Sequence, residues 1–511
     1  MNQHYDVIVI GTGIGGLACA SALSKTGQKV LALEQHYVAG GMTHTFKRKE
    51  FIWDVGVHCM GEMEPKRFPR RILNWICDGR IEMNHYDDVY DSFYFKNGMK
   101  VELPSSKDKF FNDLMAKFPQ EKTGILAYQD AINQAAKSAN QFFMMKMIPR
   151  SLVTLASPLI ARKFKKWSQK TTKSVVDELI QDPMLKTILT AQWGYYGPPP
   201  SLSSFFIHSV TIRHFWGGGY YPVGGSIVFA KEIGKTITDH GGEIRTRAKV
   251  KQVIFEHNKA VGVELEKGEI IKADKIVSAI GAKATVNNLI DHSKQQSKWA
   301  QDILKLDMSP CHVALYLGLK GDIKAAGGTP SNQWFFETTD MEDHEWDVND
   351  PKSIAPILYV SFPSLKDPKH QGDSHTVEVV TFVPYAAFSK WAETNRGKRG
   401  EDYNQFKQDL ENRLLEQLFK WRPKLRDLVV YQEFSTPLST EFYCKSTEGA
   451  IYGLSPTPQR FKCKSLRPDT PYKNFYLAGS DVGTLGVVGA MVGGLLSATK
   501  IQPKIWKEVR S

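Results

Sequence analysis

The pattern of apolar residues near the start of the chain predicts a strand, a helix and a second strand. Residues 7–10 are a continuous β-branched run (VIVI), which is typical of a strand buried on both faces of a parallel sheet. An alanine-rich stretch follows and predicts a helix that stops at Gly27. Residues 30–33 (VLAL) predict the next strand. This strand–helix–strand order indicates an α/β fold with a parallel sheet.

Apolar runs further along the chain predict more strands, one hairpin and one long helix. Asn97-Gly98 lies between two strand-like pieces in residues 86–103 and is a strong hairpin signal. Apolar residues recur every three or four positions from Tyr403 to Leu418, which predicts an amphipathic helix that Pro423 ends. Strands are also predicted in residues 241–253, 260–265, 273–279, 312–319, 377–383 and 475–477. We expect the 312–319 and 377–383 strands to share one sheet.

A glycine-rich turn, GTGIGG in residues 11–16, directly follows the first predicted strand. Gly11 permits a tight turn, Gly13 lets a pyrophosphate approach the backbone, and Gly16 allows close helix–strand packing. Glu34 ends the second strand, where its carboxylate can accept hydrogen bonds from ribose hydroxyls. Glycines alone are a weak signal in a chain that has 40 of them. The strand before them, the helix after them and the acid beyond indicate a dinucleotide site.

The pair Gly40-Gly41 favours a flavin over a nicotinamide cofactor. With it the chain resembles the FAD-binding family of phytoene desaturases, carotenoid isomerases and retinol saturases, in which a Gly-Gly pair follows the acid of the second strand. The resemblance covers nearly the whole chain. It is closest to the retinol-saturase-like (all-trans-retinol 13,14-reductase) branch, whose DVGxH pattern recurs at residues 54–58. Residues 221–225 (YPVGG) and 474–482 (NFYLAGSDV) match as well.

The resemblance implies an α/β fold with a Rossmann-type FAD-binding domain. This domain is of the glutathione-reductase-like kind, with a parallel sheet, and is interleaved with an α+β substrate domain. At 511 residues the chain has room for two domains or more. We expect the FAD-binding domain to comprise residues 1–75, 221–295 and 470–511. The substrate domain is expected in residues 76–220 and 296–469.

The resemblance also assigns residues that contact FAD. Backbone groups near Val250 pair with adenine, Asp481 binds the ribitol, and the glycine-rich helix that follows faces the flavin ring. Family members often have Gly-Asp at this point, whereas Ser480 stands here between Gly479 and Asp481. The expected FAD contacts are Gly11, Gly13, Ile14, Gly15, Gly16, Glu34, Gln35, Gly40, Gly41, Met42, Gly56, His58, Val250, Gly281, Asp481 and Val488.

Composition gives no sign of export, of a membrane span or of a metal site. The first strand begins by Tyr5, which leaves no room for a signal peptide, so we expect a cytoplasmic protein. No run of about 18 apolar residues lacks a charge or a proline, so no transmembrane helix is expected. The six cysteines show no CxxC pair, and His208 and His214 lack a third ligand. We therefore expect reduced thiols and no metal.

Most of the net charge of +12 lies in one segment. Residues 142–173 are apolar and free of acids, are interrupted by Pro149 and Pro158, and include Trp167. Such a segment can lie in a lipid interface, so we expect peripheral membrane association. The alternative is a helical lid with a solvated basic face. Nucleic acid is not an expected partner, because no binding fold accompanies the charge. The cations are Lys146, Arg150, Arg162, Lys163, Lys165, Lys166, Lys170 and Lys173.

Nine aromatic residues crowd residues 193–221. They form either the wall of a long apolar tunnel or an aromatic core. The candidate substrate contacts among them are Trp193, Phe215, Trp216, Tyr220 and Tyr221.

These features indicate an FAD-dependent oxidoreductase that acts on carbon–carbon double bonds of a retinoid, a carotenoid or an unsaturated acyl chain. The resemblance favours saturation by hydride transfer from flavin N5, and desaturation or cis–trans isomerisation stays open. Saturation needs a proton for the second carbon; His58 is the first candidate donor, with His214, Tyr220 and Tyr221 as others. Only one dinucleotide fingerprint is present, so the electron donor or acceptor stays open between a protein, a quinone and a transient nicotinamide.

Two functions of other kinds remain. A non-catalytic prenyl-lipid carrier would share the related fold of prenyl-GTPase escort and dissociation-inhibitor proteins, but such a carrier need not keep an intact flavin cradle. A flavin amine oxidase is disfavoured by the DVGxH segment and by the basic apolar insert.

Overall fold

Strands from three separated parts of the chain form one seven-stranded sheet in the computed structural model, which describes residues 4–510 except for the side chains of residues 154 and 156. The strand order is β10-β11-β12-β1-β2-β9, and β18 pairs with β12. The β10–β11 and β11–β12 pairs are antiparallel, and the other pairs are parallel. The strands are β1 His4–Ile10, β2 Val30–Leu33, β9 Glu243–Arg245, β10 Val250–Glu256, β11 Lys259–Leu265, β12 Ile270–Ser278 and β18 Phe475–Leu477. The predicted α/β fold is confirmed.

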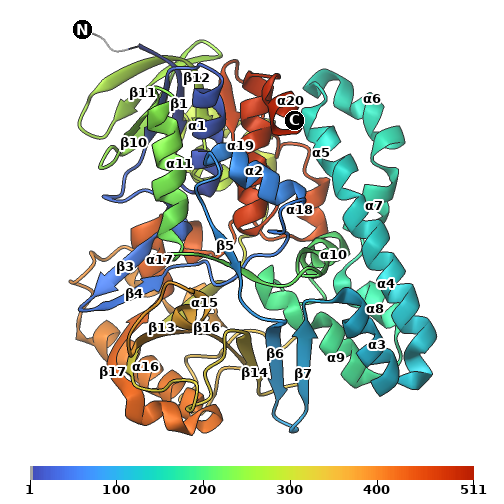
Figure 1. Ribbon diagram of the computed structural model, residues 1–511. Coiled ribbons are helices and arrows are strands. Elements are labelled where there is room, and N and C mark those ends of the chain that lie inside the picture. Colours follow the sequence, from blue (N-terminus) through green and yellow to red (C-terminus); the bar gives the residue numbers. More distant parts are fainter. Residues whose placement is uncertain (1–3, 511) are drawn as a thin grey trace.

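Glycines let two helices pack closely beside this sheet (Figure 1). α1 Ile14–Lys25 follows β1 and stops just before Gly27, and α19 Gly486–Ile501 lies against it. A Cβ at Gly494 would lie 2.0 Å from the carbonyl oxygen of Gly15, and a Cβ at Gly15 would lie 2.5 Å from Cα of Gly479. A larger residue at either position would force the two backbones apart. α11 Ile227–Asp239 packs on α1 as well.

A second seven-stranded sheet lies below the first in Figure 1. Its order is β17-β13-β16-β15-β14-β6-β7, and every pair except β14–β6 is antiparallel. The strands are β6 Val89–Phe95, β7 Lys100–Pro104, β13 Cys311–Lys320, β14 Asn332–Phe336, β15 Ile357–Ser361, β16 Ser374–Val383 and β17 Val429–Ser435. β6 and β7 form the predicted hairpin, and β13 pairs with β16 as expected. α16 Glu401–Trp421 ends before Pro423.

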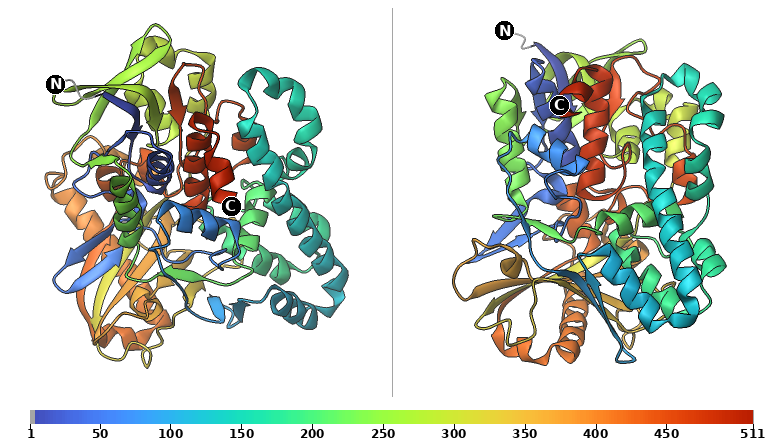
Figure 2. Two further views of the ribbon diagram at one scale, coloured as in Figure 1. Left: turned by 45° about the horizontal axis from the view of Figure 1, so that its top comes forward. Right: turned by 45° about the vertical axis from the view of Figure 1, so that its right-hand side comes forward.

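A column of helices runs along one side of both sheets (Figures 1 and 2). It comprises α3 Lys107–Lys117, α4 Lys122–Lys137, α5 Ala139–Met147, α6 Arg150–Ile160, α7 Arg162–Ser168, α8 Thr172–Leu179 and α9 Pro183–Thr190, with α10 Phe205–His214 packed against α4. The basic apolar segment forms α5–α7, which we call the lid. In the part of the chain that the structure describes, no helix combines the length and apolarity needed to cross a bilayer.

Shorter elements connect these layers. The small strand pairs are β3 Thr45–Arg48 with β4 Phe51–Asp54, and β5 Met83–His85 with β8 Tyr220–Pro222. The remaining helices are α2 Phe68–Ile76, α12 Ala282–Leu289, α13 His292–Gln295, α14 Lys298–Leu304, α15 Pro363–Lys366, α17 Pro437–Cys444, α18 Pro458–Lys462 and α20 Ile505–Arg510.

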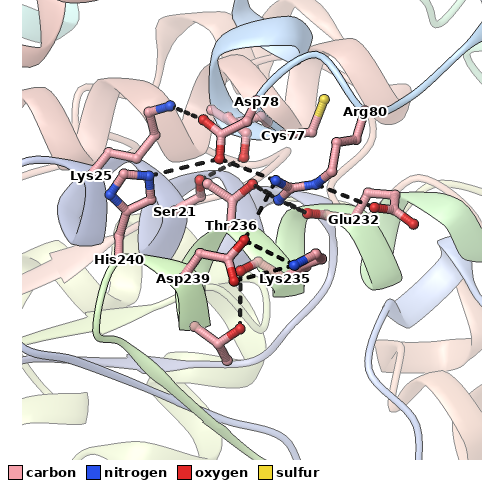
Figure 3. Close-up of polar contacts among 12 residues, drawn as sticks. Ser21, Lys25, Cys77, Asp78, Arg80, Glu232, Lys235, Thr236, Asp239 and His240 are labelled. Carbon is pink, nitrogen blue, oxygen red and sulfur yellow. Dashed lines mark hydrogen bonds and ion pairs between the residues drawn. The ribbon is translucent and has the colours of Figure 1, made fainter.

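A network of ion pairs ties α1 and α11 to the chain that follows α2 (Figure 3). Arg80 lies 3.4 Å from Asp78, 3.3 Å from Glu232 and 3.5 Å from Asp239. Lys25 of α1 pairs with Asp78 as well. Because charges of both signs alternate and remain partly exposed, this network serves packing of the elements around α1.

Candidate active site

The turn after β1 combines closely packed glycines with one that faces open space. Gly11 has a φ of 95°, which L side chains rarely adopt, and a Cβ at Gly16 would lie 2.0 Å from the carbonyl oxygen of Gly11. A Cβ at Gly13, in contrast, would meet no atom within 4 Å. The open side of Gly13 lies at the N-terminus of α1, where helix N–H groups lack intrahelical partners and favour an anion.

Gly40 and Gly41 lie directly against this turn. Gly40 forms a parallel bridge with Gly13, and its N–H donates to the carbonyl of Thr12 at 3.1 Å. A Cβ at Gly41 would lie 3.0 Å from Cα of Gly13. Both residues have positive φ, 128° and 54°, so the position favours glycine for conformation as well as for space.

The carboxylate of Glu34 is fixed beside the same turn. One oxygen accepts from the N–H and the hydroxyl of Thr12, at 3.1 and 2.6 Å, and the other accepts from the N–H of His36 at 2.8 Å. A carboxylate has about four acceptor sites, so capacity for another donor remains. The N–H of Ala248 donates to the carbonyl of Glu34 at 2.8 Å, which brings the start of β10, at Val250, close to this acid.

Asp481 joins two other segments near the end of β18. One of its oxygens accepts from the N–H of Ala282 at 2.7 Å, and the other accepts from the N–H of Leu454 at 3.1 Å. A Cβ at Gly281 would lie 3.6 Å from this carboxylate. Asp481 is only 4% exposed and is held between α12 and the chain before α18.

These groups fit a flavin dinucleotide. The glycine turn, the Gly-Gly pair and Glu34 meet where β1 and β2 end, which is where open α/β sheets bind ligands. The space at Gly13 is one that a Cβ would fill.

An aromatic cavity adjoins this region. Gly56 and His58 of the DVGxH segment line it, and so does Val488 in the first turn of α19. A Cβ at Gly56 would lie 3.2 Å from the carbonyl oxygen of Met42, so the cavity abuts the Gly-Gly segment. The aromatic lining consists of Tyr195, Phe215, Trp334, Tyr359, Phe382 and Tyr452. Such a mostly apolar cavity with few polar groups is typical of a small-molecule site.

A buried acid–base cluster lies behind His58, which lines the cavity. Nδ1 of His58 lies 2.6 Å from Oε2 of Glu378, a β16 residue whose side chain is fully buried. The other oxygen of Glu378 accepts from the backbone N–H of Asp54 at 2.8 Å. Nζ of Lys366 donates to the carbonyl of His58 at 2.8 Å and to the hydroxyl of Ser361 at 2.7 Å.

Burial shifts the pKa of each group in this cluster in the direction that favours the uncharged form of the group. Burial raises the pKa of Glu378 to about 8, against the opposing charge of Lys366. Burial, aided by the charge of Lys366, lowers the pKa of His58 to about 4. Burial lowers the pKa of Lys366 to about 8 and raises that of Asp54 to about 6. At neutral pH the imidazole is therefore neutral and Glu378 is a carboxylic acid, so Glu378 can supply a proton to the imidazole beside the cavity.

Of the five aromatic residues expected to contact substrate, Phe215 lines the cavity. Trp193 lies behind the lining, with its ring centroid 4.9 Å from that of Phe382, and Tyr221 donates its hydroxyl to the carboxylate of Asp54. The described residues around the cavity do not include Trp193, Trp216, Tyr220 or Tyr221. Half of the aromatic wall, Trp334, Tyr359 and Phe382, therefore comes from β14, β15 and β16.

Sequence reasoning missed Glu378, Lys366 and most of this wall. Glu378 gave one local signal, because it is a lone charge in the otherwise apolar run 377–383 (VEVVTFV). Trp334 and Tyr359 gave none, since their role depends on strands distant in the sequence.

Known proteins share this architecture. The model of the family "Flavin containing amine oxidoreductase" matches residues 14–502. All-trans-retinol 13,14-reductase from Rattus norvegicus is 31% identical over 98% of this chain and 86% of its own length. Prolycopene isomerase from Daucus carota is 26% identical over 100% of this chain and 82% of its own. Cyclohexylamine oxidase from Brevibacterium oxydans shares the fold with a TM-score of 0.64 and 17% identity, covering 99% of this chain and 100% of that one. The chain therefore belongs to the flavin-containing amine oxidoreductase family, on the retinol-reductase branch expected from its sequence, and is an FAD-dependent oxidoreductase.

Proposed function

We propose that the protein saturates a carbon–carbon double bond in a long apolar substrate, such as a retinoid, a carotenoid or an unsaturated acyl chain. The observation that carries this proposal is the close contact between His58, which lines an aromatic cavity, and the buried Glu378 behind it. A polyene can bind through aromatic contacts, and its reduction requires a proton at one carbon. The similarity to all-trans-retinol 13,14-reductases supports reduction over the other reactions of the family.

Bound FAD would supply the two-electron chemistry, by hydride transfer from N5. We propose that the cofactor is held by the residues around the β1 turn and Asp481, together with the neighbouring residues expected from the resemblance. This set is Gly11, Gly13, Ile14, Gly15, Gly16, Glu34, Gln35, Gly40, Gly41, Met42, Gly56, His58, Val250, Gly281, Asp481 and Val488.

The chain itself would exclude water, orient the substrate and deliver a proton. The aromatic lining excludes water from the apolar substrate. His58 donates a proton to the substrate carbon, and Glu378 restores that proton through Nδ1. The hydroxyl of Tyr359, which has no hydrogen-bond partner among the described residues, is available to a polar end group of the substrate.

The test is an anaerobic incubation of chemically reduced protein with retinol, a carotene and a polyunsaturated fatty acid, followed by mass spectrometry. A gain of two hydrogens by one of them is the expected result and identifies the substrate class. An unchanged mass with a shifted retention time would replace saturation by isomerisation, the activity in the name of the carrot relative. Loss of two hydrogens with oxidised protein would make it a desaturase.

A lipid carrier is the alternative of another kind. A carrier has no use for buried ionisable groups beside an apolar cargo, and burying them costs free energy. A flavin-free protein that binds the polyene without changing it would favour the carrier.

We also propose that the lid rests on a membrane surface. Leu155 and Leu159 of α6 are 77% and 85% exposed, and Leu152 is 51% exposed. Lys163 and Lys166, directly after α6, are exposed as well. Exposed leucines beside lysines are typical of a helix that lies in a lipid interface. Binding to anionic vesicles that survives both high salt and replacement of Lys163 and Lys166 by Gln would contradict the electrostatic part.

A further inference from the structure

A second cavity lies between the lid and residues 460–467. Its volume is about 370 Å³, and it shares no lining residue with the aromatic cavity. Phe142 and Phe164 of the lid form part of its wall, with ring centroids 5.0 Å apart. The ring centroid of Phe461, which lies in the 460–467 segment, is 6.1 Å from that of Phe164. One part of the cavity is therefore apolar.

The rest of the lining is strongly basic. Three cations, Lys146, Arg460 and Arg467, are 7%, 4% and 4% exposed. Three more, Lys165, Lys462 and Lys464, line the cavity and are exposed at the surface. Asp481 is the one acid among the described residues of the lining. Buried cations thus lie deep in the cavity, and exposed lysines lie where it meets solvent.

The buried cations are held by carbonyl groups more than by carboxylates. Nζ of Lys146 donates to the carbonyl of Leu466, and Arg460 donates to two further carbonyls. Within residues 4–510, neither Lys146 nor Arg460 forms an ion pair, and Arg467 pairs with Asp469 at 3.3 Å. Asp481 is already bonded by two backbone N–H groups. Of the three cations only Arg467 has a carboxylate partner, so Lys146 and Arg460 have no paired counter-ion among the described residues.

We propose that this cavity binds the phosphate of an anionic phospholipid, with the acyl chains along Phe142 and Phe164 toward the exposed leucines of α6. The site has the two chemistries that such a lipid presents: cations for a phosphate and an aromatic wall for hydrocarbon. A soluble phosphate ester would use the cations and leave the apolar wall unused. The inference rests on the proposed membrane docking of the lid and is independent of the proposed reaction.

The test is flotation of the FAD-loaded protein with phosphatidylcholine vesicles that contain phosphatidic acid or oleic acid, brought to equal zeta potential. Phosphatidic acid supplies a phosphate, and oleic acid supplies charge without one. We expect the wild-type protein to bind the phosphatidic acid vesicles about tenfold more tightly, because charge-assisted hydrogen bonds add to general attraction.

Two double variants, which remove the same number of charges, test which lysines cause the preference for phosphatidic acid. In the cavity variant, Lys462→Gln with Lys464→Gln, we expect the preference for phosphatidic acid to disappear. In the control, Lys163→Gln with Lys166→Gln, we expect the preference to remain, because these lysines are outside the cavity lining. Both variants lose general attraction, by about fivefold per lysine.

Each other outcome overturns a defined part of the inference. Equal loss of preference in both variants would assign it to surface charge and contradict the site. Competition by soluble glycerol phosphate as strong as by phosphatidic acid vesicles would replace the lipid by a free phosphate ester. Release of flavin by the cavity variant would show that the cavity belongs to the FAD site. No binding of the wild-type protein to either vesicle would contradict the docking, while the mass-spectrometric test of the reaction would stand unaffected.

Discussion

The two cavities bury ionisable side chains in opposite ways. Beside the aromatic cavity, Glu378 is an acid and His58 and Lys366 are bases, and each lies against another polar group of the cluster. In the basic cavity, Lys146 and Arg460 have the same sign and no carboxylate partner among the described residues. A mixed cluster can exchange a proton internally, whereas a cluster of one sign needs a counter-ion from outside. This difference separates a site for chemistry from a site for binding.

The largest expected effect is on turnover. His58→Ala removes the proposed proton donor, so we expect turnover to fall about 100-fold or more while FAD stays bound. The measurement is anaerobic reoxidation of the reduced protein by substrate, followed by flavin absorbance. His214→Gln is the control, since His214 lines the same cavity and its Nε2 is already bonded to the N–H of Gly61 at 2.7 Å. Unchanged turnover in His58→Ala would contradict its proposed role.

Replacement of Glu378, the proposed source of the proton, should change how turnover depends on pH. The proton on Glu378 is present below its pKa of about 8 and is lost above it, so wild-type turnover should fall as pH rises through about 8. Lys366 and Asp54 face the same carboxyl group and titrate near pH 8 and 6. Glu378→Gln cannot titrate, so we expect about tenfold lower turnover and a flattened alkaline limb.

The matched control for this profile is Glu433→Gln. Glu433 lies on β17 of the same sheet, and its side chain is 31% exposed. An alkaline limb that persists unchanged in Glu378→Gln would assign the titration to another group, with Lys366 as the nearest candidate.

The pH dependence of stability should show that Lys146, in the basic cavity, has no paired counter-ion. Burial and the charges of Arg460 and Arg467 lower the pKa of Lys146 to about 7, from an ordinary value near 10.5, whereas Cys463 and Asp481 oppose this shift. Between these pH values the unfolded chain binds more protons, so the contribution of Lys146 to stability rises with pH. We expect the Tm difference between wild type and Lys146→Met to shift in favour of wild type from about pH 7 to about pH 10. A Tm difference that does not change with pH would show that the folded protein does not lower the pKa of Lys146.

The partly exposed network of Figure 3 should give the smallest effect. Arg80 is 26% exposed and pairs with three carboxylates, so we expect Arg80→Ala to lower the free energy of unfolding by about 1 kcal/mol. Denaturant unfolding measures this, with Lys298→Ala, 90% exposed and outside the network, as the control. Flavin content and vesicle binding should stay unchanged, and a large loss of either would show that the network supports a site.

Short-range patterns of residues in the sequence predicted much of the fold. The strand at residues 30–33, the hairpin at Asn97-Gly98 and the helix that ends before Pro423 were predicted because each depends on neighbours in the sequence. The FAD region could be predicted for the same reason, since its turn, helix and acid follow one another within one βαβ unit. The expected domain boundaries remain predictions.

The sequence by itself determined the cofactor class, the parallel sheet and the basic charge of the lid. Only the tertiary structure brought Glu378 of β16 to within 2.6 Å of His58, and only it built one basic cavity from Lys146 and residues more than 300 positions away. These sites depend on contacts between distant segments, and the pKa values depend on burial, which arises only when those segments pack together. Local periodicity identifies an element and its buried face, but it does not identify the partner that covers that face.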